Sequence, residues 1–164
     1  MKILFVSGTK HSGKTPTCIQ LDKQFILKFK KSQQSFKYQN SSDFVNFYTG
    51  KTNKGQPVTV ILNSACDLVC IIEQFIEALK NFLNSTEFHK TSVIILITAI
   101  RNQGDKIRQK MEDELKNIFL ETEIIEIPLS RINEKSDKAI HQWYHLKMNE
   151  LIKHTLKNPP FELL

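Results

Sequence analysis

The chain has 164 residues, a formal net charge of +6, and 40% hydrophobic and 24% charged residues. This composition is that of an ordinary globular protein, and the length favours one domain with a sizeable core. No apolar run reaches the roughly 18 residues that a membrane span needs. The N-terminal apolar stretch has no small-residue cleavage site, and the cysteines number only three, so a cytoplasmic protein with reduced thiols is expected.

The positive charge is unevenly distributed along the chain. Residues 1–90 carry the whole excess, whereas residues 91–164 are balanced. A basic half attracts polyanions in general, but the sequence contains no recognised nucleic-acid-binding module. A solvated helix face together with a site for a triphosphate explains the excess, and nucleic acid is not expected as a partner.

The first elements expected are a strand over residues 2–7 and a helix over 14–31, where apolar residues recur at intervals of three and four. Pro16 fits the first turn of this helix, because an N–H at that position has no intrahelical partner. The connection between the two elements matches the pattern G-x-x-x-x-G-K-[ST] without a gap. Its residues are Gly8, Thr9, Lys10, His11, Ser12, Gly13, Lys14 and Thr15.

This motif predicts a site for the phosphates of a nucleotide. Glycines let the backbone curl so that successive N–H groups point inward, at the N-terminus of a helix. Lys14 is expected to reach the β- and γ-phosphates, and the Thr15 hydroxyl is expected to bind Mg²⁺. His11 either adds a donor toward phosphate or stands at a permissive position. The expected ligands are Mg²⁺ and ATP or GTP; the alternative is a chance match in a strand-to-helix turn.

The remaining elements continue the alternation, which predicts a three-layer α/β/α sandwich, with a mainly parallel sheet, in one domain over 1–164. Residues 36–38 form a short β-like piece, and 44–48 with 58–62 are expected to form an antiparallel hairpin. The continuous apolar run 93–97 is typical of a central parallel strand that is buried on both faces. The other expected elements are a helix over 67–82, a helix over 105–120 with Asp105 as its cap, a strand over 124–128, and a helix from a Ser136 cap to about residue 157.

The strand, loop and helix, together with this element order, resemble the P-loop NTPases. The loop itself resembles that of molybdopterin-guanine dinucleotide biosynthesis protein B, which reads approximately G-x-K-N-S-G-K-T. Gly8, Lys10, Ser12, Gly13, Lys14 and Thr15 match this pattern, and His11 stands in place of Asn. The narrower resemblance covers about the first two dozen residues, whereas the wider one covers the chain.

A carboxylate that holds Mg²⁺ is expected where a strand beside the first one ends. The strand over 58–62 is the best candidate, but it ends at Asn63, which can hold only a metal-bound water. The frame in which G-proteins carry D-x-x-G is here Asn63 to Cys66, and the first carboxylate after it is Asp67. Asp67 therefore either reaches the metal or caps the next helix. Just before the expected hairpin, at Asp43, G-proteins carry a switch segment. Here Ser41 and Ser42 either supply a second hydroxyl to Mg²⁺ or form an ordinary turn with Asp43.

The segment after the expected central strand lies where open α/β sheets bind ligands. It lacks the N-K-x-D by which G-proteins read guanine, so the sequence does not support guanine specificity. Arg101 in this segment either stacks on a base, acts as an arginine finger in cis, or is a surface residue. Arg131, after the last strand, has the same three roles open to it.

Two pairs of possible metal ligands are spaced four apart, Cys66 with Cys70 and His141 with His145. Neither pair has the further ligands that a structural zinc site needs. Core packing is expected for the cysteines, including Cys18, and a solvated or Trp143-packed helix face for the histidines.

The expected activity is slow hydrolysis of a nucleoside triphosphate, or phosphoryl transfer to a small acceptor. Lys14, Asp67 and Arg101 are the candidate catalytic residues, and Thr15 with Asp67 the candidate metal ligands. A protein partner that supplies an arginine in trans would complete such a site. The alternative is a non-enzymatic, nucleotide-dependent binding module, since Asn63 stands where a carboxylate is expected. A small-molecule kinase is less favoured because no arginine-rich lid is evident.

Overall fold

The computed structural model describes residues 1–39, 41–90, 92–132 and 137–164, and it is an α/β fold with one mixed, mostly parallel sheet. The expected fold class is confirmed at this level. The strands are β1 Lys2–Gly8, β2 Lys30–Lys31, β3 Phe36–Lys37, β4 Phe44–Lys51, β5 Pro57–Asn63, β6 Val93–Ile100 and β7 Glu123–Leu129. The helices are α1 Lys14–Lys28, α2 Val69–Leu83, α3 Lys106–Ile118 and α4 Lys138–Lys157. Within the described residues, none of the helices combines the length and the apolar character that a membrane crossing requires.

The sheet has the strand order β2-β4-β5-β6-β1-β7, with β3 also paired to β4. Strands β5, β6, β1 and β7 are parallel, and β4 pairs with β5 as the expected hairpin. Strand β6 is central, as its continuous apolar run predicts. The expectation that β5 lies beside β1 is wrong, because β6 stands between them and pairs with both.

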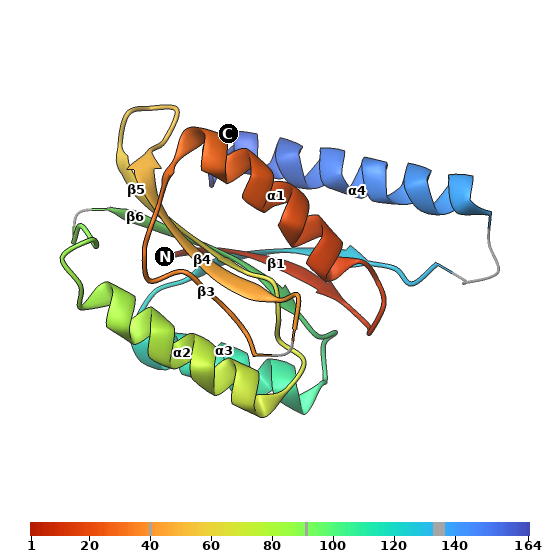
Figure 1. Cartoon of the computed structure of the whole chain (residues 1–164), viewed down its shortest axis with the longest axis horizontal. Coiled ribbons are helices and arrows are strands. Elements are labelled where there is room, and N and C mark those ends of the chain that lie inside the picture. The colour runs from red at the N-terminus through yellow and green to blue at the C-terminus, as the bar shows by residue number, and fades with distance from the viewer. Residues whose placement is uncertain (40, 91, 133–136) are drawn as a thin grey trace.

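Alternating side chains of the strands build two separate cores. Leu4 and Val6 of β1 point to the face that α1 and α4 cover, and Ile3 and Phe5 point to the face that α2 and α3 cover. Figure 1 shows the two helix pairs on opposite sides of the sheet. Cys18 is fully buried on the inner side of α1, as expected.

The helix ends depart from the sequence expectations by a few residues. Helix α1 ends at Lys28, three residues early, because Phe29 is extended and β2 then pairs with β4. Helix α2 begins after Leu68, so Asp67 is not its cap. Asp105 caps α3 as expected, since its side chain accepts a hydrogen bond from Ile107 N at 2.8 Å. The predicted Ser136 cap lies outside the described residues, and Asp137 caps α4.

The neighbouring strands β1 and β6 are followed by helices on opposite faces of the sheet. Helix α1 covers one face, and α3, which follows β6, covers the other (Figure 1). Where connections leave in opposite directions from adjacent parallel strands, a crevice forms at the carboxyl ends of those strands. Residues 9–13, after β1, and 101–105, after β6, therefore begin at the place where an open α/β sheet binds ligands.

Candidate functional site

The loop between β1 and α1 has a tightly curled backbone. Gly13 has φ of 91° and His11 has φ of 66°, both in the left-handed region. A Cβ on Gly8 would lie 2.3 Å from Ser12 Oγ and 2.8 Å from Leu129 O. A Cβ on Gly13 would lie 2.3 Å from Cε1 of His145. Both glycines of the motif are therefore required by the geometry of the loop.

The start of α1 presents backbone donors. Thr17 N–H donates to Gly13 O at 3.1 Å, and the amides before it have no intrahelical acceptor. Pro16 has no N–H, so the donors at this helix end are the amides of Gly13, Lys14 and Thr15. The Ser12 hydroxyl is buried and makes no hydrogen bond within the described part of the chain. Buried polar atoms normally have a partner, so these groups suit a bound anion.

Lys14 folds back over the beginning of the loop and is only 7% exposed. Its Nζ donates to Gly8 O at 2.9 Å and to Thr9 O at 2.7 Å. Burial lowers the pKa of Lys14, and the negative charge of Asp67 partly opposes that effect. Because its two acceptors are neutral carbonyls, an anionic oxygen would be a stronger partner for this ammonium group.

Thr15 lies beside Asp43 rather than beside Asp67. Its Oγ1 donates to Asp43 Oδ1 at 2.8 Å, and Ser64 Oγ donates to the same oxygen at 3.2 Å. Ser41 Oγ donates to Asp43 Oδ2 at 2.9 Å. The expected pairing of Thr15 with Asp67 is thus not made by the side chains. Asp43, which the sequence did not single out as a metal ligand, occupies that place.

Asp67 forms an ion pair with Arg101, with 2.9 Å between Asp67 Oδ1 and Arg101 Nε. The side chains are 41% and 22% exposed, respectively. Both charges act on the pKa of Lys14, in opposite directions. The three predicted catalytic residues are therefore gathered at the carboxyl ends of β1, β5 and β6, with Arg101 held by Asp67.

Asn63 is fully buried and uses all of its hydrogen-bonding capacity. Its Nδ2 donates to Ala65 O at 2.8 Å and to Thr98 Oγ1 at 3.0 Å. Its Oδ1 accepts from Tyr38 OH at 3.0 Å and from Ala65 N at 3.3 Å. Burial raises the pKa of Tyr38, which keeps the phenol protonated as a donor. Asn63 thus joins β5, β6 and the segment after β3, and has no capacity left to hold a metal-bound water.

The cysteine and histidine pairs take different positions. Cys66 is buried, which raises the pKa of its thiol to about 12, whereas Cys70 is exposed and does not pack into the core as expected. His145 packs against Gly13, so it contacts the loop instead of a solvated face. No set of three or more His, Cys, Asp or Glu side chains in the described residues is arranged to hold a metal ion by itself.

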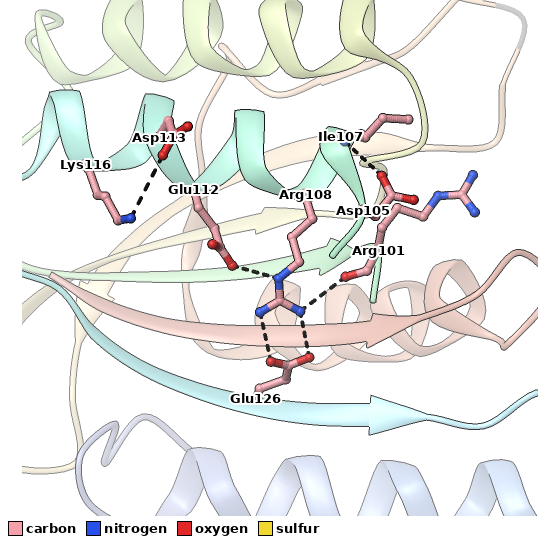
Figure 2. Close-up of polar contacts among 8 residues, drawn as sticks. All are labelled: Arg101, Asp105, Ile107, Arg108, Glu112, Asp113, Lys116 and Glu126. Atoms are coloured by element: carbon pink, nitrogen blue, oxygen red, sulfur yellow. Dashed lines mark hydrogen bonds and ion pairs between the residues drawn. The ribbon is translucent and has the colours of Figure 1, made fainter. Parts of the chain in front are cut away.

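Sequence reasoning missed a buried arginine cluster beside the loop that follows β6. Figure 2 shows Arg108 between α3 and β7, with Nη1 and Nη2 each donating to one carboxylate oxygen of Glu126 at 2.9 Å. Its Nε donates to Glu112 at 2.7 Å, and Nη1 also donates to Arg101 O at 3.3 Å. Arg108 is the main cause that lowers the pKa of Glu126. The available signals were the i,i+4 spacing of Arg108 with Glu112 and a carboxylate that interrupts the apolar β7.

Two open cavities adjoin the loop. A crevice of about 660 Å³ lies at the ends of β1 and β7 and is lined by Ser7, Thr9, Asn102, Gln103, Glu126, Pro128, Leu129, Ser130 and Arg131. A groove of about 520 Å³ runs between α1 and α4, and Pro16, His141, Gln142 and His145 are among its lining residues.

Comparisons of this chain with protein-family models, with curated proteins and with solved structures found no match.

Proposed function

We propose that this chain is a cytoplasmic P-loop protein that binds a magnesium–nucleoside triphosphate and either hydrolyses it slowly or transfers its terminal phosphoryl group to a small acceptor. The observation that carries the proposal is the loop between β1 and α1. Both motif glycines are sterically required, Lys14 is buried against the loop carbonyls, and the Ser12 hydroxyl lacks a partner among the described residues. These features suit a cradle for phosphate oxygens.

The loop residues would divide the work of holding the phosphates. The amides of Gly13, Lys14 and Thr15 would donate to one phosphoryl group at the helix N-terminus. Lys14 would exchange the carbonyls of Gly8 and Thr9 for phosphate oxygens and neutralise their charge. Because phosphoryl transfer depends mainly on positioning and charge stabilisation, these contacts are the principal contribution of the loop.

Thr15 and Asp43 are suited to hold Mg²⁺ together with the phosphates. Magnesium prefers oxygen ligands and is often bound by one or two carboxylates, substrate phosphates and waters. The hydroxyl and carboxylate oxygens already lie 2.8 Å apart. The bound ion would neutralise charge on the β- and γ-phosphates. Asp67 stays the second candidate, because its carboxylate also lies near Lys14 but is paired with Arg101.

Arg101 is the candidate for stabilising charge at the terminal phosphate. Its guanidinium lies near Lys14 and is held by Asp67. Figure 2 shows its side chain directed away from the Arg108 cluster, while its carbonyl faces Arg108. Arg108 thus holds the backbone carbonyl of Arg101. The side chain of Arg101 is not used in that contact, so it is available to a phosphate bound in the loop between β1 and α1. A partner protein that donates an arginine in trans is the alternative source of this charge.

The replacement of Asp43 by Asn tests the metal assignment. The Asp43→Asn variant is expected to weaken magnesium-dependent ATP binding by roughly tenfold or more, a typical lower bound for residues that support a bound metal. ATP binding in the presence of EDTA should change little. Isothermal titration with and without Mg²⁺ measures both quantities. Asp67→Asn is the matched control, and a magnesium dependence lost only in that variant would move the metal to Asp67.

The second candidate function, a nucleotide-dependent binding module, is favoured by Asn63. This side chain stands where the sequence led us to expect a carboxylate, and it is fully engaged in the core. Phosphate release from saturating Mg·ATP and Mg·GTP is therefore expected to stay below roughly 1 s⁻¹, the lower end for kinases. A faster rate in the isolated chain would contradict the argument, and nucleotide binding without any release would favour the module.

A further inference from the structure

The two sides of the phosphate loop differ in chemical character. On the β5 and β6 side lie the charged pairs, Thr15 with Asp43 and Asp67 with Arg101. On the β7 side lies the open crevice of about 660 Å³, which meets the loop at Thr9. The crevice volume falls within the range of about 300–1,000 Å³ that is usual for small-molecule sites.

This difference sets the direction in which a nucleotide would lie. A triphosphate is linear, with the metal-bound terminal phosphates at one end and the nucleoside at the other. Since the metal candidates and Lys14 gather on the β5 and β6 side, the organic part would leave toward β7. The crevice on that side spans the ends of β6, β1 and β7, where adjacent connections diverge, and this is the usual ligand position in an open α/β sheet.

The crevice carries groups that suit a nucleoside. Asn102 and Gln103 are exposed at its rim, and each side-chain amide offers donors and an acceptor to a base edge or a sugar hydroxyl. Pro128 and Leu129 supply an apolar surface. Glu126 also lines the crevice, and Arg108 occupies one site on each of its carboxylate oxygens. Ser7 and Gln103 also act on this carboxylate as hydrogen-bond donors, so a sugar hydroxyl would take the place of one of them.

We infer that this crevice binds the nucleoside of the nucleotide, with Asn102 and Gln103 contacting the base and Glu126 accepting from the ribose hydroxyls. The inference rests on the proposed function, since it needs phosphates in the loop. The groove between α1 and α4 is the competing location. It lies along the helices instead of at the strand ends. Its side next to the loop is lined by Pro16 of α1, which has no N–H to offer a phosphate, and by His145, which packs against Gly13.

Isothermal titration of the intact chain with inorganic magnesium tripolyphosphate, Mg·ATP, Mg·GTP and Mg·2′-deoxyATP tests this inference. The double variant Asn102→Ala/Gln103→Ala is expected to bind its preferred nucleotide about tenfold more weakly than the wild type, as for the loss of two neutral hydrogen bonds. Its tripolyphosphate affinity should be unchanged. The Gln142→Ala variant, which removes an exposed amide from the competing groove, is the matched control and should bind like the wild type.

Each outcome separates the two proposals. The nucleoside assignment would be overturned if ATP and GTP bound no more tightly than tripolyphosphate. It would also be overturned if the double variant kept wild-type affinity for the nucleotide. Either result would leave the phosphate site in the loop unaffected. A loss confined to Gln142→Ala would move the nucleoside to the groove. Equal binding of ATP and 2′-deoxyATP would overturn the role given to Glu126 at the 2′-hydroxyl. If tripolyphosphate itself fails to bind, the proposed function fails, and the crevice assignment fails with it.

Discussion

Replacing Lys14 with alanine is expected to weaken Mg·ATP binding by about 2–5 kcal/mol, the range for truncating one partner of a buried, hydrogen-bonded charge pair. Lys14 is only 7% exposed, and burial lowers its pKa because the charged form is poorly solvated. A phosphate oxygen would replace neutral carbonyl partners with a charged one, so the variant loses a strong, desolvated contact. Isothermal titration of both proteins at one salt concentration measures the difference.

Lys10→Ala is the matched control, because Lys10 belongs to the same loop but is exposed. An exposed charge is screened by water and salt, so its removal should cost no more than about 1 kcal/mol. Thermal unfolding of both variants separates lost binding from a disordered loop, since Lys14 also ties down the carbonyls of Gly8 and Thr9. If a folded Lys14→Ala protein keeps wild-type affinity, the loop is not the phosphate site.

Local sequence patterns predicted most elements of this fold, but not the neighbours of every strand. The strand, loop and helix at the N-terminus follow from residues close in sequence, and the central place of β6 follows from its continuous apolar run. The apolar run of β5 indicates that the strand is buried, but it does not indicate which strands it pairs with. Pairing depends on how α2 returns the chain to the sheet, and β6 therefore separates β5 from β1.

The candidate site shows the same division between local and long-range information. Fixed spacing within the motif identified Lys14 and Thr15 and the two glycines. The partner of Thr15 is Asp43, 28 residues further along the chain. Asp43 directly precedes β4, and the pairing of β4 with β5 brings it close to the loop. The burial of Arg108 likewise depends on a long-range contact. A charge at that position is tolerated only with Glu112 and Glu126 around it, and only the spacing of Arg108 with Glu112 is local.

Asn63 illustrates how a motif-based comparison can mislead about a single residue. The sequence led us to expect a carboxylate for Mg²⁺ at the end of β5, on the premise that β5 lies beside β1, and on that premise Asn63→Asp would restore a metal site. In the structure all four hydrogen bonds of its amide are made inside the core. An amide suits this position because its Nδ2 donates to two acceptors and its Oδ1 accepts from two donors where β5, β6 and the segment after β3 meet.

The Asn63→Asp variant is therefore expected to lose about 3–5 kcal/mol of folding free energy at pH 7, the range for a charge left buried without a partner. The new carboxylate oxygen would face the Ala65 carbonyl, an acceptor, and Thr98 Oγ1, whose proton is already donated to Ala99 O. Burial would raise the folded-state pKa of this Asp above its unfolded value of roughly 3.9, so its penalty would be small below that pH and grow as pH rises toward the folded pKa.

Urea denaturation followed by circular dichroism at pH 4 and pH 7 measures this penalty. The control is Tyr38→Phe, which removes one neutral hydrogen bond to the same amide and should cost roughly 0.5–1.5 kcal/mol, with no such dependence on pH. A deficit that is large at pH 7 and shrinks toward pH 4 would establish Asn63 as a structural amide. An Asn63→Asp protein as stable as the wild type, with faster magnesium-dependent phosphate release, would instead show that position 63 is a metal position that has lost its carboxylate.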